Sequence, residues 1–305
     1  VGPLHVAMAS PLGKDHLDHR APPAAGELEP LRLRPYLFPG KIGGHFLYLS
    51  VDISAISGEL NQHDYLLDEA LCGPGRQVLD IGCGNGKATA AIAAQLPQGR
   101  VIGIDSSPEM IELAVRHHAN TGGPHLMFEL LDVRDMEYVE WFDVAFSNAA
   151  LHWIKDHLRM LHRVGKALKK GGRLLFQMGG RGNARAIIGI LDEILKKPKW
   201  SPFFADFFFP YGFYGVDEYQ RWLTRVGFNP RRVELIPKDM IHKGKDGFAG
   251  WIRSTWLPYL SRIPEQMKEA FIEAIIDAYL VELPPDKDGL VHVDMVRLEV
   301  EAVKP

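Results

Sequence analysis

The stretch VLDIGCGNG, residues 78–86, decides the fold expected for this chain of 305 residues. An aliphatic run stops at an acid, three alternate glycines follow, and a helical pattern resumes over residues 87–96. This order predicts a strand, a tight loop and a helix. Because glycine has no Cβ, such a loop can turn at positive φ. A ligand can then lie against its amides, at the positive end of the helix.

The next apolar stretch, RVIGID at residues 100–105, predicts a second strand that also ends in an acid, Asp105. It follows the loop by about 20 residues, the spacing at which a carboxylate meets a ribose held at the first strand. The sequence therefore predicts a bound nucleoside.

The spacing of the glycines indicates which nucleoside. A dinucleotide-binding loop has the form G-x-G-x-x-G, whereas here Gly82, Gly84 and Gly86 alternate and Asp80 precedes the turn. An acid at that place would repel a pyrophosphate but suits a cationic amino-acid portion. A nicotinamide-binding loop, or a glycine-rich turn with no ligand, is the alternative.

The same stretch resembles motif I of the class I S-adenosylmethionine-dependent methyltransferases, usually (V/I)LD(I/V)GCGxG. The resemblance implies S-adenosylmethionine as cofactor and S-adenosylhomocysteine as product. It also implies an α/β fold: a Rossmann-like, seven-stranded, doubly wound sheet, with a helical and aromatic insertion forming a substrate cap.

Composition bounds the remaining possibilities. At 46% hydrophobic residues and a net charge of −3, the chain is globular, with no basic stripe for nucleic acid. We expect a small-molecule substrate and a monomer or homodimer. No apolar run approaches the roughly 20 residues of a membrane span. Two cysteines, Cys72 and Cys83, form no disulfide framework, which favours a reducing, cytoplasmic location.

Residues 1–44 are rich in Pro, His, Gly and Ala without a sustained period, so we expect an irregular extension. The methyltransferase domain is expected over residues 45–305, with cap elements at about 45–71, 198–215 and 246–282. Tyr48 and His63, in the first cap element, are candidates to line the substrate site.

Further cofactor contacts follow from the next elements. Ser107, Pro108 and Glu109 predict a helix start by N-cap, proline and acid. After a third strand, residues 126–131, an Asp side chain and the next backbone N–H supply the acceptor and donor that adenine requires. The resemblance gives Asp105 the ribose hydroxyls and Met110 the adenine, although Met110 can also be a core residue. The expected cofactor set is Asp80, Gly82, Cys83, Gly84, Gly86, Asp105, Ser106, Met110, Asp132, Val133 and Asn148.

The fourth strand, residues 141–148, is a continuous apolar run typical of a central parallel strand. Ligands of open α/β sheets bind beyond the carboxyl ends of the strands. We therefore expect Asn148 beside the methionine portion of the cofactor, and His152 and Trp153 as catalytic residues at the acceptor. A capping histidine and a packing tryptophan are the alternatives.

The second half of the chain predicts alternating elements. We expect a helix over residues 156–168 ended by Lys169-Lys170-Gly171-Gly172, a strand over 173–178, a helix over 216–226, a strand over 232–241 and a reversed edge strand over 290–303. An aromatic run over residues 203–214 is either an acceptor pocket or core.

The segment LKKGGRLLF (168–176) resembles the post-motif of the same class I family, usually LKPGGxLL, with Lys170 in place of the proline. The segments WIRSTWLPYL (251–260) and VRLEVEAVKP (296–305) resemble the trans-aconitate methyltransferase branch and its relatives that methylate carboxylates. The expected substrate-binding residues are Tyr48, His63, Phe213, Arg253 and Trp256.

We expect no metal, because holding donor and acceptor in line can contribute roughly 7–11 kcal/mol. A carboxylate acceptor would need only orientation by His152, Trp153 and Arg253. A hydroxyl or phenol would instead need His152 as general base. The leading hypothesis is O-methylation of a carboxylic acid. The alternatives are C-methylation of a lipid, quinone or sterol-like acceptor, and a non-catalytic cofactor-binding partner protein.

Overall fold

The structure is a computed structural model that describes residues 75–96, 98–118 and 125–305. The expectations for residues 1–44 and 45–71, with Tyr48 and His63, lie outside the described residues.

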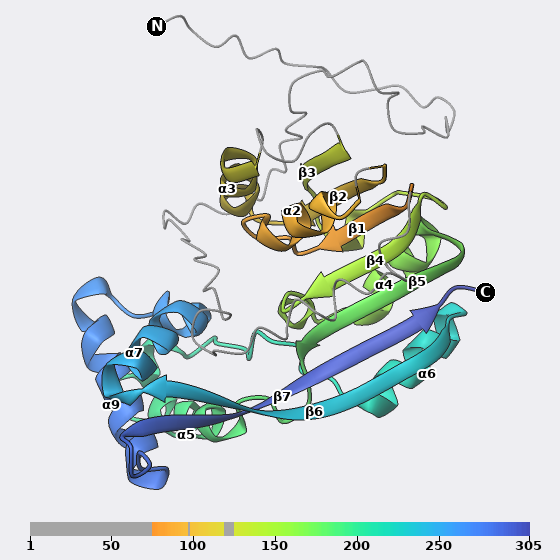
Figure 1. The fold of residues 1–305 in the computed structure, drawn as a ribbon. Helices are drawn as coiled ribbons and strands as arrows, with labels where there is room; N and C mark the ends of the chain where they lie inside the picture. The colour runs from red at the N-terminus through yellow and green to blue at the C-terminus, as the bar shows by residue number, and fades with distance from the viewer. Residues whose placement is uncertain (1–74, 97, 119–124) are drawn as a thin grey trace, which may run out of the picture. The chain divides into compact units, whose positions relative to one another are not determined.

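The described residues form a seven-stranded sheet of order β3-β2-β1-β4-β5-β7-β6 (Figure 1). The first five strands in this order pair in parallel, and β7 runs antiparallel to both of its neighbours. The strand order reverses direction at β1 and β4, where α/β sheets open a crevice for ligands. The strands are β1 (Gln77–Ile81), β2 (Arg100–Asp105), β3 (Leu126–Leu130), β4 (Phe142–Asn148), β5 (Leu168–Gly179), β6 (Asn229–Lys243) and β7 (Leu290–Val303).

Helices connect the strands and lie on both faces of the sheet (Figure 1). The start of α3 is as predicted, because the Ser107 hydroxyl accepts a hydrogen bond of 3.2 Å from the Met110 amide. Within the described ranges, no helix is both long and apolar enough to span a bilayer. The α-helices are α2 (Lys87–Ala94), α3 (Pro108–His118), α4 (His157–Ala167), α5 (Arg185–Leu195), α6 (Val216–Val226), α7 (Gly244–Thr255), α8 (Leu257–Leu260) and α9 (Lys268–Glu282). Short 3-10 turns are η3 (Val133–Asp135), η4 (Leu151–Trp153), η5 (Ser201–Phe203) and η6 (Glu265–Met267).

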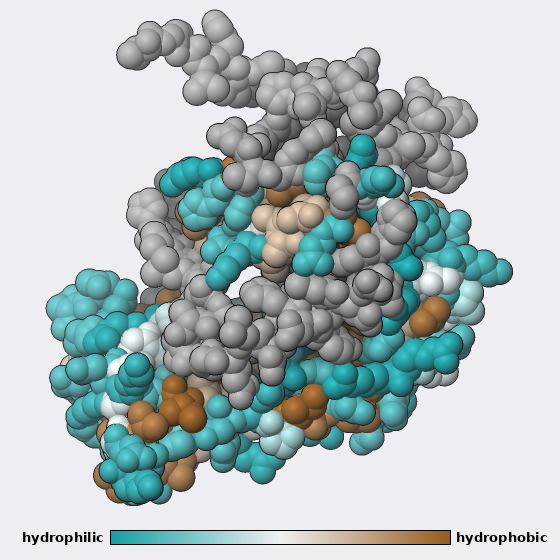
Figure 2. Space-filling view, viewed as in Figure 1, coloured by the Kyte–Doolittle hydropathy of each residue, from teal (hydrophilic) through white to brown (hydrophobic). Residues whose placement is uncertain are grey.

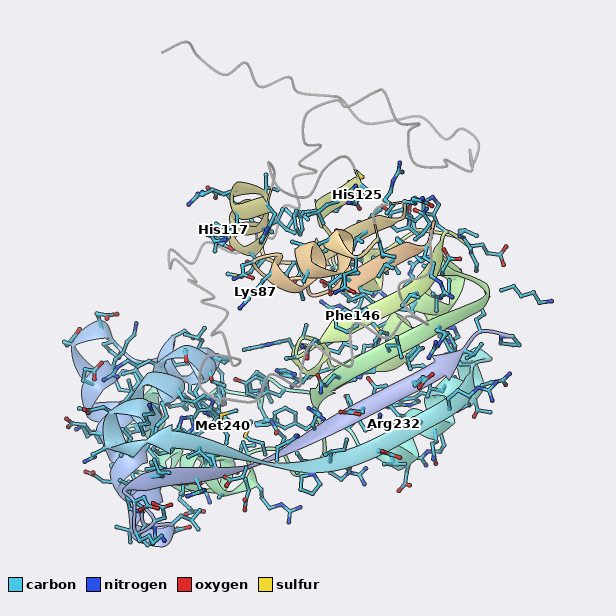
Figure 3. All side chains as sticks on the ribbon, in the orientation of Figure 1. Lys87, His117, His125, Phe146, Arg232 and Met240 are labelled. Atoms are coloured by element: carbon cyan, nitrogen blue, oxygen red, sulfur yellow. The ribbon has the colours of Figure 1, made fainter. Side chains whose placement is uncertain are left out.

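The central strands are buried on both faces, as their apolar runs predict. On one face Leu161 and Leu223, from α4 and α6, pack with Phe176 of β5. On the other, Ile92 of α2 packs with Phe146 of β4, which is labelled in Figure 3. Burial of such side chains stabilises the fold by about 1.5–3 kcal/mol each, and it fixes the strand ends that carry the polar residues.

A second core lies where β6 and β7 extend beyond the rest of the sheet. β5 pairs with β7 only over residues 297–303 of β7, whereas β6 follows β7 down to Leu290. The projecting ends pack against α5, α7 and α9 (Figure 1), around side chains such as Trp251, Phe271 and Val293. Most of the aromatic run after Trp200 packs into or against this core. On the face shown in Figure 2, apolar side chains form small patches between hydrophilic ones.

Two expectations were wrong, one about the end of α4 and one about the place of β7 in the sheet. The pair Lys169-Lys170 does not form the last turn of α4, which ends at Ala167. Leu168 already pairs with Phe142, and Lys169 donates to Asp143 at 2.9 Å, so a bulge takes the place of a helix end. β7 is reversed as predicted but is no edge strand, because β6 covers its outer side and is itself the edge.

Candidate active site

The loop after β1 depends on three glycines, which have no side chain. Gly82, Gly84 and Gly86 have φ values of 73°, 54° and 80°, a region that residues with a Cβ rarely adopt. A Cβ on Gly82 would lie 2.2 Å from the Cβ of Ala150, which follows β4. A Cβ on Gly86 would lie 2.6 Å from the ring of Phe128. Gly82 thus lets the β1 loop touch the residues that follow β4, and Gly86 lets it lie against the ring of Phe128 in β3.

Asp105, at the end of β2, is tied directly to this loop. Its carboxylate accepts hydrogen bonds from the amides of Gly84 at 3.0 Å and Ser107 at 2.9 Å. Burial raises the pKa of Asp105 despite these bonds. A carboxylate offers about four lone-pair sites, so two neutral donors leave room for further hydroxyl donors. The pairing joins the two strand ends that the sequence implicated separately.

Asp80 is more enclosed than the sequence suggested. It is 2% exposed and accepts a hydrogen bond of 2.7 Å from the hydroxyl of Thr89 in α2. Burial, opposed by the Thr89 hydrogen bond and assisted by the Asp105 charge, raises the pKa of Asp80 to about 7. Burial likewise raises the pKa of the Cys83 thiol, so this cysteine serves packing rather than reactivity.

The residues expected to hold the adenine lie near β2 and β3. Asp132 caps the η3 turn, accepting from the Arg134 amide at 2.8 Å and pairing with its guanidinium at 2.5 Å. Burial raises the pKa of Asp132, but hydrogen bonds from Arg134 outweigh it and the net pKa is lowered. Met110 and Val133 are buried and Ser106 is exposed. The Arg134 partner was not anticipated from the sequence.

At the end of β4, three polar side chains form a chain of hydrogen bonds that the sequence analysis did not predict. With its amide oriented to suit its neighbours, Gln177 donates to Asn148 Oδ1 at 2.8 Å and accepts from the Arg297 guanidinium at 2.7 Å. Because this bond occupies the oxygen of Asn148, its amide nitrogen is left to donate. The next residue, Ala149, has a φ of 56°, a strained value of the kind that clusters at functional sites.

His152 is held as a neutral hydrogen-bond donor. Its Nδ1 accepts from the Gly179 amide at 3.4 Å, which leaves the proton on Nε2. Burial, with a smaller contribution from His157, lowers the pKa of His152 to about 4. The ring is therefore uncharged at neutral pH, and its second nitrogen carries a hydrogen rather than a lone pair.

Aromatic rings form a wall beside His152. Phe213 lies 5.9 Å from its ring, and Tyr211 lies 4.9 Å from Trp153, which is 39% exposed. Tyr211 stacks on Phe213 at 5.3 Å with an interplanar angle of 2°. Trp256 is buried and contacts Tyr211 edge-on at 5.9 Å. The structure thus brings Phe213 and Trp256 to the same wall, and adds Tyr211 as its centre.

Arg253 is not brought to this wall. It is exposed on α7 and pairs with Glu269 of α9 at 2.5 Å. The structure therefore offers no support for Arg253 as a clamp on the substrate. Trp256 lies just beyond Thr255, where α7 ends, and its side chain is buried.

Comparison with known proteins agrees with this arrangement. A family profile described as a methyltransferase domain matches residues 73–203. An uncharacterized methyltransferase of Schizosaccharomyces pombe is 32% identical over 213 residues, which cover 67% of this chain and 78% of that protein. A trans-aconitate 2-methyltransferase of Streptomyces avermitilis is 30% identical, covering 67% of this chain and 77% of its own.

A solved structure shares the fold at lower identity. The YcgJ protein of Bacillus subtilis aligns with a TM-score of 0.55 at 17% identity, covering 79% of this chain and 97% of that one. This similarity concerns the fold alone. Taken with the glycine loop, the acid that ends β2 and the relatives of 30% identity or more, it leads to one assignment. The chain belongs to the class I S-adenosylmethionine-dependent methyltransferases, and S-adenosylmethionine is its cofactor.

Proposed function

We propose that this enzyme methylates a carboxylate oxygen of a small organic acid at the carboxyl ends of β1 and β4. The observation that carries the proposal is the state of His152, whose Nδ1 is taken by the Gly179 amide and whose ring is neutral. A neutral imidazole with hydrogen on Nε2 donates a hydrogen bond and cannot remove a proton through that nitrogen.

The residues present suit the cofactor. The glycine loop offers backbone amides, Asp105 keeps lone pairs for the ribose hydroxyls, and Asp80 supplies an acid near the expected amino-acid portion. When bound, S-adenosylmethionine supplies an already activated methyl group. The chain then needs to orient the acceptor and exclude water, which is a positioning effect.

The polar groups at the end of β4 match an acceptor that carries its own negative charge. Both His152 and Asn148 are held as donors, by Gly179 and by Gln177. A carboxylate accepts such bonds and is nucleophilic without losing a proton, whereas a hydroxyl acceptor requires a base. Relatives named trans-aconitate 2-methyltransferases support an acid as acceptor. We extend the proposal to cap elements at 198–215 and 246–282, whose aromatic rings would hold the body of the acid.

To test the proposal, the purified enzyme is incubated with isotope-labelled S-adenosylmethionine and a panel of acids and hydroxyl compounds, and methyl transfer is measured. The panel holds trans-aconitate, aromatic and aliphatic monocarboxylic acids, and phenols of matching shape. We expect S-adenosylhomocysteine and a base-labile methyl ester from at least one acid, and none from the phenols. Turnover of the phenols alone would refute the assignment.

C-methylation of an apolar acceptor is the second candidate. The stacked rings of Tyr211 and Phe213 beside His152 favour it, because they offer an apolar surface for an unsaturated chain. Its product would carry a base-stable methyl group. Hydrolysis of the labelled product in mild alkali separates the two candidates.

A further inference from the structure

A buried histidine outside the proposed contacts holds both ends of the η4 turn, which carries His152 and Trp153. His157, at the start of α4, is 1% exposed. Its Nε2 lies 3.0 Å from the carbonyl oxygen of Leu151 and 2.9 Å from that of Ile154. Carbonyl oxygens only accept hydrogen bonds, so Nε2 must carry the proton.

The other ring nitrogen fixes that tautomer. His157 Nδ1 lies 2.5 Å from the hydroxyl of Tyr219 in α6. With the proton on Nε2, Nδ1 is a lone pair and the Tyr219 hydroxyl donates to it. Burial lowers the pKa of His157 to about 4, so the ring stays neutral at physiological pH. All three polar contacts of the ring are then satisfied at once.

The opposite tautomer would release the turn. The Tyr219 hydroxyl also lies 3.2 Å from the sulfur of Met178, so it has a second acceptor within reach. If the proton moved to Nδ1, Tyr219 would turn to Met178, and the Nε2 lone pair would face two carbonyl oxygens. Both carbonyls would lose their bond to His157, although the Leu151 carbonyl keeps the Ile154 amide as a donor at 2.9 Å. A buried acceptor left without a donor costs free energy, and this cost would fall on the Ile154 carbonyl.

Two further carbonyls, one within the turn and one just after it, are also bound. The Gly212 amide donates to the His152 carbonyl at 2.8 Å, and the Tyr214 hydroxyl donates to the Lys155 carbonyl at 2.6 Å. A Cβ on Gly212 would lie 2.4 Å from the Ile154 carbonyl oxygen, so only glycine permits this approach. The turn is thus held along its length before any ligand binds.

We propose that His157 and Tyr219 are positioning residues of the methyl-transfer site, in which the Nε2–H tautomer of His157 sets the place of His152 and Trp153. The inference rests on the proposed placement of methyl transfer at this turn. It assigns a role to two residues that touch neither the reacting groups nor the proposed substrate wall.

The first test needs no acceptor. Nitrogen-15 spectra of the histidines and amide hydrogen exchange over residues 151–155 are measured in the wild type and in Tyr219→Phe. We expect a neutral Nε2–H ring for wild-type His157. In Tyr219→Phe we expect part of the population as Nδ1–H and at least ~10-fold faster exchange at Ile154. An Nδ1–H ring in the wild type, or unchanged exchange in the variant, would overturn the inference.

The second test compares two amide substitutions. Glutamine places its amide nitrogen near the Nε2 position, whereas asparagine reaches only the Nδ1 position. We expect His157→Asn to lower kcat about 10- to 100-fold, as for a small misplacement of a catalytic group. His157→Gln should recover at least part of that loss. The affinity of either variant for S-adenosylhomocysteine, measured by calorimetry, should stay within about two-fold of the wild type.

The matched control is His162→Gln, an exposed histidine on the same helix, which should behave as the wild type. Equal activity of the His157→Gln and His157→Asn variants per folded molecule would show a merely structural role. If no acid in the panel is turned over, the proposed function fails. The spectra and exchange rates still decide the role of His157.

Discussion

The loop after β1 and the turn after β4 end neighbouring strands, yet they are held in opposite ways. The loop takes its shape because Gly82 has no side chain, which allows it to contact Ala150. The turn is held by the side chain of His157, three residues after Ile154, and His157 is in turn held by Tyr219, 62 residues further along the chain. A loop of the first kind is visible in a short motif, whereas a turn of the second kind becomes visible only in the fold.

The largest effect is expected from adding a side chain at Gly82 in the loop after β1. We expect Gly82→Ala to abolish binding of S-adenosylhomocysteine and to destabilise the fold by about 2–5 kcal/mol. The new Cβ would lie 2.2 Å from that of Ala150 at a φ of 73°. Positive φ costs roughly 1–2 kcal/mol and overpacking about 1–3 kcal/mol. Thermal unfolding and calorimetry measure both.

Two further variants separate the cost of the positive φ from the cost of the steric clash with Ala150. Gly171→Ala meets the same backbone conformation, at a φ of 76°, with nothing within 4 Å. It should therefore lose only about 1–2 kcal/mol and keep cofactor binding. The double variant Gly82→Ala, Ala150→Gly removes the collision and should recover part of the binding. If it binds no better than Gly82→Ala, contact between loop and turn is not the cause.

The sequence predicted elements set by local pattern and missed those set by distant pairing. β2, α6 and β7 begin and end at the expected residues, because an apolar run, a C-terminal glycine or a β pattern marks each within a few positions. The end of α4 was missed because Leu168 pairs with Phe142 across the sheet. Glycines and carboxylates of the candidate site follow motif spacing. Gln177, Arg297 and Tyr219 lack such a signal, since each acts through a partner far along the chain.

The next effect concerns the histidine on the turn. We expect His152→Ala to lower kcat/KM for the preferred acid about 100-fold, and His152→Gln to keep more activity, because its amide can still donate. The pKa of His152 is lowered to about 4, so the ring is already neutral from about pH 5 upward. Its titration should therefore leave the rate flat between pH 6 and 8. A rise through pH 6.5 that His152→Gln removes would indicate a general base.

A smaller effect is expected from the one acid inside the loop motif. The pKa of Asp80 is about 7 in the fold and near 3.8 in the unfolded chain. The folded state therefore binds the extra proton between these pH values, and this carboxyl lowers stability as pH rises from about 4 to 7. We expect Asp80→Asn to remove that slope and to raise the free energy of unfolding at pH 8 by about 1–3 kcal/mol.

The affinity for S-adenosylmethionine should rise with pH, in the opposite direction to the stability of the fold. A cationic cofactor favours the ionised carboxylate, so wild-type affinity for S-adenosylmethionine should increase from pH 6 to pH 8. The affinity of Asp80→Asn should be lower and nearly independent of pH. Thr89→Val serves as the control, since it removes the donor to Asp80 and leaves the acid in place. An Asp80→Asn enzyme that binds as tightly as the wild type would leave Asp80 with a structural role only.

The smallest expected effect tests whether the turn depends on all of its contacts or chiefly on His157. Tyr214 donates to the Lys155 carbonyl at the outer end of the turn, where water can replace the bond. Tyr214→Phe should therefore cost no more than about 1 kcal/mol in stability and leave kcat within about three-fold. Gly212, whose amide binds the His152 carbonyl, cannot be tested so simply, because any side chain would strike Ile154. If Tyr214→Phe lowers kcat as much as His157→Asn, the turn depends on all its contacts together rather than on the buried histidine.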